Sequence, residues 1–204
     1  MQDIYVINLP HRNDRLEKIK SIFSNFNIIV VEGVKHDDPV IGCFLSHKKC
    51  LLIAKEKNLK NIVVMEDDCC PFDNILNFTN RFNEIKKYLD EHDNWNIFLG
   101  GTIETKKINI VNKIENTNNL FNINIGYCTH LIIYNCTIFD YFLNHDLNKP
   151  IDHTWMEKYN AIVSIPFIAS QDDVYSDILK SNYSYDTRIR QTNEILVKYI
   201  RKKY

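Results

Sequence analysis

Three consecutive carboxylates, Glu66, Asp67 and Asp68, directly follow an unbroken apolar run at residues 62–65. Such a short apolar run is typical of a strand buried on both faces, as in a parallel sheet covered by helices. Carboxylates crowded at the end of a buried strand repel one another and lose hydration. A divalent cation relieves this repulsion, because Mg²⁺ and Mn²⁺ favour carboxylate oxygens. The pattern indicates a metal site, with a solvated acidic turn or a helix N-cap as the alternative.

Two arginines lie in the turn after the predicted first strand. Residues 3–9 mix β-branched and aromatic side chains, and Arg12 and Arg15 follow Pro10. Open α/β sheets bind ligands beyond the carboxyl ends of their strands, and a guanidinium donates two hydrogen bonds at once to a phosphate or carboxylate. The two arginines therefore indicate an anion site, with an ordinary solvated helix start as the alternative.

The cysteines offer a second kind of metal chemistry. Cys43, His47 and Cys50 recur at i, i+4 and i+7, so on a continuous helix they share a face, and Cys69 and Cys70 are available to complete a zinc site. The paired CxxC spacing of zinc sites is absent, however. The sequence therefore favours buried, reduced thiols in a protein of cytoplasmic type.

Strand and helix patterns alternate along the chain, which predicts βαβ units. Strands are predicted at residues 3–9, 28–31, 62–65, 95–99, 121–125, 129–134 and 161–168. The last of these suits an edge strand, because Pro166 interrupts it. Helices are predicted from about residue 16, at 42–59 with Ser46 as N-cap, at 71–89, at 137–147 and from Pro150. Residues 102–119 suit either a hairpin or a mobile flap.

Length and charge narrow the class of protein. The 204 residues suit one domain over residues 1–204, with a C-terminal tail from about residue 184 as an option. A net charge of -1 provides no general case for binding nucleic acid. No apolar run approaches the ~20 residues that span a bilayer, and the N-terminus lacks the regions of a signal peptide. We therefore expect a cytoplasmic protein, and peripheral contact with a membrane remains open.

Five segments occur in a fixed order along nearly the whole chain: VINLPHRNDR (6–15), GCFLSHKKCL (42–51), VVMEDD (63–68), PID (150–152) and QDDVYSDI (171–178). Together they resemble glycosyltransferase family 25, which contains lipooligosaccharide and procollagen galactosyltransferases. The resemblance implies a GT-A fold, an α/β nucleotide-sugar-binding domain with a mostly parallel central sheet flanked by helices. It also implies a UDP-hexose donor, Mn²⁺ or Mg²⁺, and inversion at the anomeric carbon.

The resemblance also implies roles for individual residues. Glu66 and Asp68 match the metal motif of the family, and Asp67 is a candidate for orienting the sugar hydroxyls. The donor pocket is expected to contain Asn8, Leu9, Arg12, Arg15, Ser46, His47, Glu66, Asp67 and Gln171. A satisfied core histidine is the alternative for His47.

Inversion in a single displacement needs a base near the acceptor hydroxyl. Asp152 is the first candidate and Asp173 the second, and a helix N-cap is the alternative role for Asp152. The acceptor is expected to be a saccharide or a protein with hydroxylysine-type hydroxyls, and the sequence does not distinguish galactose from glucose.

Two other functions remain open. A metal-dependent nucleotidyltransferase also places carboxylates after a strand, although the chain has no Gly-rich phosphate loop. A catalytically weak, glycosyltransferase-like module for binding or assembly is the second alternative.

Overall fold

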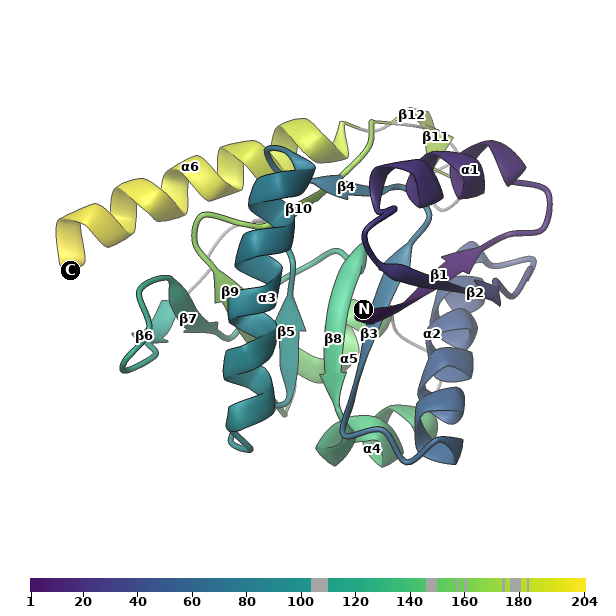
Figure 1. The fold of residues 1–204 in the computed structure, drawn as a ribbon, viewed down its shortest axis with the longest axis horizontal. Helices are drawn as coiled ribbons and strands as arrows, with labels where there is room; N and C mark the ends of the chain where they lie inside the picture. Colours follow the sequence, from purple (N-terminus) through teal and green to yellow (C-terminus); the bar gives the residue numbers. More distant parts are fainter. Residues whose placement is uncertain are drawn as a thin grey trace.

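The computed structural model describes residues 1–103, 110–145, 150–156, 158–159, 161–173, 175–176, 181–182 and 184–204. Its centre is an eight-stranded sheet with the order β2-β1-β3-β8-β5-β9-β7-β6 (Figure 1). The strands are β1 Asp3–Asn8, β2 Asn27–Glu32, β3 Asn61–Glu66, β5 Ile97–Leu99, β6 Ile110–Lys113, β7 Leu120–Ile123, β8 Leu131–Asn135 and β9 Ala161–Ser164. All except β7 and β8 run in one direction. The predicted α/β fold with a mostly parallel sheet is confirmed.

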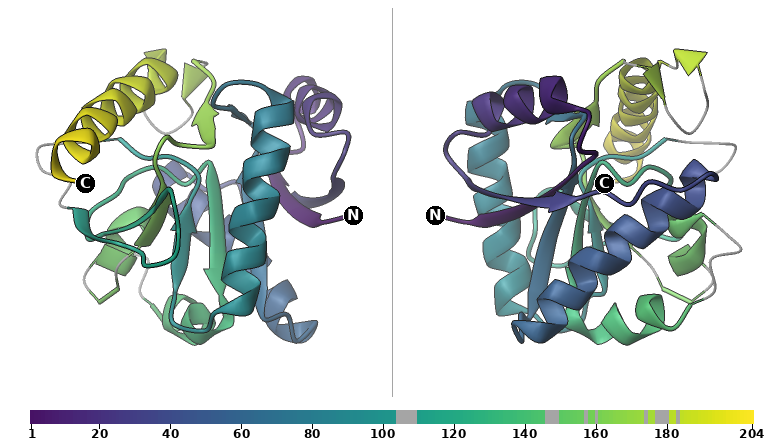
Figure 2. Two further views of the ribbon diagram at one scale, coloured as in Figure 1. Left: turned by 60° about the vertical axis from the view of Figure 1, so that its left-hand side comes forward. Right: turned by 90° about the vertical axis from the view of Figure 1, so that its right-hand side faces the viewer.

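Helices cover both faces of this sheet. They are α1 Asn13–Ile22, α2 Pro39–Glu56, α3 Ile75–Glu91, α4 Phe139–Leu143 after the short 3-10 helix Cys136–Ile138, α5 Ile151–Met156 and α6 Tyr185–Lys203. The right-hand view of Figure 2 shows α1 and α3 on one side of the sheet and α2 and α4 on the other. Two small antiparallel sheets pair β4 Cys69–Pro71 with β10 Ala169–Gln171, and β11 Tyr175–Ser176 with β12 Ser181–Asn182.

The central strand β3 explains why its sequence is uninterruptedly apolar. Ile62 and Val64 belong to the core cluster under α2, whereas Val63 and Met65 belong to the cluster under α1 and α3. Successive side chains of a strand point to opposite faces, so a strand covered on both faces needs apolar residues at every position. Each fully buried aliphatic side chain contributes about 1.5–3 kcal/mol.

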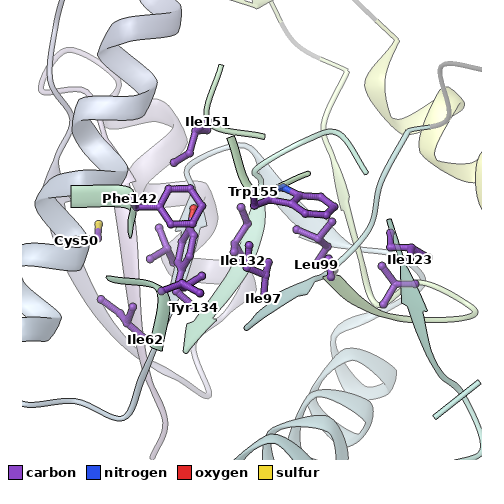
Figure 3. Packing of buried hydrophobic residues seen from close by; sticks show 14 of the residues in the cluster. Cys50, Ile62, Ile97, Leu99, Ile123, Ile132, Tyr134, Phe142, Ile151 and Trp155 are labelled. Atoms are coloured by element: carbon purple, nitrogen blue, oxygen red, sulfur yellow. The ribbon is translucent and has the colours of Figure 1, made fainter. Parts of the chain in front are cut away.

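The cluster under α2 is rich in large aromatic side chains. Tyr134 of β8 packs edge-on against Phe142 of α4, with ring centroids 5.4 Å apart, as Figure 3 shows. Trp155 of α5 is 1% exposed and belongs to the same cluster. This packing holds α4 and α5 against the sheet, and Asp152 lies on α5.

Two sequence predictions about local structure are wrong. Ser46 does not cap α2: Asp38 does, since its side chain accepts a hydrogen bond from Val40 N at 2.8 Å, and Pro39 occupies the first turn. The strand β9 is not an edge strand, because it lies between β5 and β7. Pro166 follows the end of β9 and therefore removes no donor from the ladder.

The segment predicted as a hairpin or a flap is a hairpin in its described part. Strand β6 pairs antiparallel with β7, while residues 104–109 lie outside the described residues. Strand β4 was not predicted, since its three residues carry no periodic pattern. Among the described residues, no helix is long and apolar enough to cross a membrane.

Candidate functional site

The topology brings the predicted site residues to one edge of the sheet. Strands β1, β2 and β3 are parallel neighbours, so Asn8, Glu32 and Glu66 end them side by side. Strand β8 runs antiparallel to β3, and the residues that precede it therefore lie at the same edge. Glu66 N donates to the carbonyl oxygen of His130 at 3.0 Å. The acidic motif is thus bordered by residues from both strands.

Asp67 is held by two side chains from the first motif. Asn8 Nδ2 donates to Asp67 Oδ2 at 2.8 Å, and Arg15 Nη1 donates to Asp67 Oδ1 at 2.9 Å. Burial raises the pKa of Asp67, while the hydrogen bond and charge of Arg15 and the bond from Asn8 oppose this shift. Both carboxylate oxygens are engaged, so Asp67 has a defined orientation.

Asp68 has one oxygen bonded and one oxygen without a partner. Gln171 Nε2 donates to Asp68 Oδ2 at 3.1 Å, and Arg15 Nη1 lies 3.3 Å from the same oxygen. Asp68 Oδ1 is buried and has no hydrogen-bond partner among the described residues. Burial, followed by the charges of Glu66 and Asp67, raises the pKa of Asp68 to about 7. A buried oxygen with these properties suits a bound cation.

Glu66 faces helix α2. Its Oε1 lies 3.4 Å from His47 Nε2 and 3.7 Å from Cys43 Sγ, and it accepts a hydrogen bond from Thr129 Oγ1. Burial favours the neutral form of Glu66, but the hydrogen bond and charge of His47 and the Thr129 hydroxyl lower its pKa overall. His47 is 0% exposed, and its Nδ1 lies 2.9 Å from the Tyr134 hydroxyl. A buried chain of polar groups therefore links Glu66 to β8.

A cavity of about 380 Å³ opens onto this edge. Its volume is within the usual range for small-molecule sites. The predicted residues that line it are Leu9, Arg15, Ser46, His47, Glu66, Asp67, Asp68 and Gln171. The structure thus brings most of the predicted donor residues around one hollow.

Two predicted donor residues are not among those that line the cavity. Asn8 is 4% exposed and acts on the cavity through Asp67. Arg12 makes a two-pronged contact with Asp14, with both nitrogen–oxygen distances at 3.2 Å. Of the two arginines, Arg15 therefore borders the cavity directly.

The two candidate bases lie in different surroundings, and neither lines the cavity. Asp152, in the first turn of α5, accepts a hydrogen bond from Cys128 N at 3.3 Å. Burial raises the pKa of Asp152. Asp173 is exposed, and its Oδ1 accepts a hydrogen bond from Asp186 N at 2.9 Å in the first turn of α6. Asp173 therefore has a structural role as a cap.

Cys128 lies near both Asp152 and the acidic motif. Its thiol is buried, and burial followed by the charges of Asp152, Glu66 and Asp68 raises its pKa well above the usual range. The backbone at Cys128 has a φ of 84°, an uncommon conformation for a residue other than glycine. The Cys128 thiol thus lies within electrostatic reach of both Asp152 and the acidic motif.

Several residues that line the cavity are not among the predicted donor residues. The cavity is also lined by His11, Gly33, Val34, Lys35, His36, Asp37, Pro39, Gly42, Cys43 and Tyr185. The loop between β2 and α2 follows the end of a parallel strand, which was a usable signal. Thr129 and His130 could not be assigned to the site in this way, because the residues of β8 do not reveal that the strand runs antiparallel to β3. Asp177 of the last motif lies outside the described residues.

Residues 37–137 match the sequence model of glycosyltransferase family 25 (LPS biosynthesis protein). The match contains the second and third of the five sequence motifs, and the expected resemblance to this family is confirmed. No curated protein matches the chain.

Several solved structures resemble the chain at low identity. A197 from STIV has a TM-score of 0.48 and 9% identity, over 84% of this chain and 86% of its own. A glycosyltransferase involved in the glycosylation of the major capsid of PBCV-1 has a TM-score of 0.42 and 11% identity, over 69% of this chain and 62% of its own. An apo UDP-glucose pyrophosphorylase has a TM-score of 0.48 and 11% identity, over 100% of this chain and 82% of its own. At these scores the likenesses support no inference about activity.

Proposed function

We propose that this chain, whose residues 37–137 match the model of glycosyltransferase family 25, is a member of that family and transfers a hexose from a UDP-sugar to an acceptor hydroxyl with inversion at the anomeric carbon. Galactose and glucose are the candidate sugars. The acceptor is a saccharide or a protein with hydroxylysine-type hydroxyls. The observation that carries the proposal is the buried Asp68 Oδ1, which has no hydrogen-bond partner in the described part of the chain and lies at a ligand-sized cavity.

The residues present fit a hard divalent cation, Mn²⁺ or Mg²⁺. Asp68 offers an unbonded carboxylate oxygen, and Glu66 from the same motif lines the same cavity. Protein sites for Mg²⁺ commonly use one or two carboxylates together with substrate phosphates. When bound, the cation would stabilise the negative charge that grows on the departing diphosphate.

Asp67 and Arg15 would position the donor. Asp67 is fixed by Asn8 and Arg15, so its carboxylate can accept hydrogen bonds from sugar hydroxyls in one orientation. Arg15 borders the cavity, and its guanidinium suits a phosphate oxygen. Leu9, Ser46 and His47 form further parts of the cavity wall, and Arg12 supports the turn through Asp14.

Asp152 is the proposed base that removes the proton from the acceptor hydroxyl. Its raised pKa, caused by burial, moves the carboxylate toward the range in which a general base is effective. Glu66 and Asp68 line the cavity and Asp152 does not, so the proposed base and the proposed metal ligands are different groups in different places. Asp173 is the second candidate, although it caps α6.

The direct test uses the full chain with UDP-galactose or UDP-glucose and Mn²⁺. We expect UDP release that EDTA abolishes and that is lost in Asp68→Asn. A matched control is Asp140→Asn, because Asp140 is exposed, pairs with Lys55 and does not line the cavity. Activity with a nucleoside triphosphate instead of a UDP-sugar would favour the nucleotidyltransferase. UDP-sugar binding without UDP release would favour the binding module. Absence of both release and binding would refute the proposal.

A further inference from the structure

Cys43, His47 and Glu66 form a compact group on the wall of the cavity. Cys43 and His47 lie one turn apart on α2, and Glu66 ends β3. One ligand atom of each, a thiol sulfur, an imidazole nitrogen and a carboxylate oxygen, lies within 4.8 Å of the other two. All three residues line the cavity, so one side of the group is open to a further ligand.

Two of the three spacings in this group are close to those of a tetrahedral zinc site. With Zn–S of about 2.3 Å and Zn–N and Zn–O of about 2.0–2.1 Å, neighbouring ligand atoms lie about 3.3–3.6 Å apart. In this structure His47 Nε2 lies 3.4 Å from Glu66 Oε1, and Cys43 Sγ lies 3.7 Å from the same oxygen. The third pair, Cys43 and His47, has its ligand atoms within 4.8 Å of each other, so side-chain shifts alone can bring all three atoms around one cation.

The chemistry of the group selects the metal. Thiolate and imidazole ligands favour Zn²⁺, whereas Mg²⁺ and Mn²⁺ prefer oxygen ligands. The Tyr134 hydroxyl, 2.9 Å from His47 Nδ1, provides the outer hydrogen bond that orients a metal-binding histidine. On binding, the thiol proton of Cys43 leaves to solvent, and the proton of His47 resides on Nδ1, where the Tyr134 oxygen accepts it.

We propose that Cys43, His47 and Glu66 bind one Zn²⁺ ion, with the fourth position open to the cavity. This set differs from the one considered from sequence, since Glu66 takes the place of Cys50 and of the cysteines of β4. All six cysteines are free, and Cys50 is buried in the core under α2.

The zinc site would regulate sugar transfer, a consequence that rests on the proposed function. Glu66 is a proposed ligand of both the zinc site and the Mn²⁺ or Mg²⁺ site. A Glu66 carboxylate that binds Zn²⁺ is no longer available to the cation that would bind with the donor. Zn²⁺ should therefore inhibit the Mn²⁺-dependent reaction. Binding of Zn²⁺ itself does not depend on whether the chain transfers a sugar.

Binding is tested on the full, metal-free chain with Co²⁺ as an optical probe and with Zn²⁺ in competition against a chromogenic chelator. We expect one equivalent of Co²⁺ to produce the near-ultraviolet charge-transfer band of a cobalt–thiolate bond, which Zn²⁺ removes. Cys43→Ser should lose the band and bind Zn²⁺ at least tenfold more weakly. The matched control Cys136→Ser changes an exposed cysteine outside the group and should retain both.

Tyr134→Phe provides a variant in which all three ligands remain. Loss of the outer hydrogen bond should weaken Zn²⁺ binding about 10–100-fold while the cobalt band persists. Absence of the band in the wild-type chain, or equal Zn²⁺ affinity in Cys43→Ser, would overturn the zinc site. If the band forms but no UDP is released with Mn²⁺, the zinc site stands and the proposed function fails. If UDP is released and Zn²⁺ does not inhibit it, the regulatory consequence is wrong.

Discussion

Glu66, Asp67 and Asp68 are adjacent in the chain, yet each carboxylate contacts a different part of the fold. Glu66 contacts His47 on α2, Asp67 contacts Asn8 and Arg15, and Asp68 contacts Gln171 of β10. The first two carboxylates are engaged by hydrogen bonds, and the third keeps one oxygen without a partner among the residues that the structure describes. The repulsion within the motif is therefore concentrated at Asp68.

Asp68→Asn should stabilise the metal-free protein at neutral pH. The pKa of Asp68 is about 7 in the folded chain and near 4 when unfolded, so the folded state binds more protons between these values. The contribution of the Asp68 carboxyl group to the free energy of unfolding therefore falls as the pH rises from about 4 to about 7. In urea unfolding with a chelator present, the free energy of unfolding of Asp68→Asn should exceed that of the wild-type chain by about 2–4 kcal/mol at pH 7.5. At pH 4 the two should be almost equal. A lower stability of the variant at pH 7.5 would contradict this account.

Asp152→Asn should separate transfer from donor binding. Because a general base contributes about 10²–10⁴-fold, transfer to an acceptor should fall at least 10²-fold, while binding of UDP and Mn²⁺ is retained. The comparison is Asp173→Asn, whose amide oxygen can still accept the hydrogen bond from Asp186 N, so it should preserve the start of α6 and leave transfer nearly unchanged. Calorimetric titration and a UDP-release assay measure the two quantities. Retained transfer in Asp152→Asn together with lost transfer in Asp173→Asn would assign the base to Asp173.

At the scale of elements, helix α2 organises one side of the site. It carries Cys43, Ser46 and His47, and its start is held by Asp38. Ser46 Oγ donates to Gly42 O at 2.7 Å and accepts from Val34 N at 2.8 Å. Ser46 therefore ties α2 to the loop before it, a different role from the N-cap predicted from its residue type.

The N-caps of α2 and α3 allow a matched test of this arrangement. Asp38→Ala and Asn74→Ala each remove a side-chain cap, so each should cost about 1 kcal/mol in urea unfolding. Only Asp38→Ala should also weaken binding of UDP with Mn²⁺, since α3 contributes no residue to the lining of the cavity. Equal loss of binding in both variants would indicate a general effect of stability instead.

At the scale of the whole molecule, α6 closes the core from the far end of the chain. Ile189 and Leu196 belong to the cluster under α2, and Asn193 Oδ1 accepts a hydrogen bond from Phe167 N at 2.8 Å. Tyr185, the first residue of α6, lines the cavity. The segment considered as a tail thus contributes to both core and site. That residues 1–204 form one domain stays a prediction.

Leu196→Ala should destabilise the whole chain by about 2–5 kcal/mol, because a buried side chain is removed and a cavity remains. The neighbouring Ile195→Ala is the control, since Ile195 is 53% exposed and should change stability by less than about 0.5 kcal/mol. Urea unfolding followed by fluorescence measures both. A single transition in each would support one domain, and an unaffected Leu196→Ala would show that α6 is not part of the folding unit.

Local patterns were sufficient for much of the fold. The periodicity of apolar residues predicted β1, β2, β3 and the amphipathic α3, because strands and helices repeat at different intervals. The same patterns did not reveal β4 or the inner position of β9, because those depend on partners far away in the chain. Most of the predicted donor residues line the cavity, because the type of a residue and its position just after a predicted strand are both readable from the sequence.

The sequence by itself determined which side chains carry charge and that the acidic motif ends a buried strand. Only the tertiary structure decided that Asp68 Oδ1 has no partner within the described ranges, that Glu66 meets Cys43 and His47, and that Arg15 rather than Arg12 borders the cavity. The physical reason is the range of the interactions. Residue type and periodicity are local properties, whereas the reversed direction of β8 and the pairing of β4 with β10 arise from hydrogen bonds between distant segments.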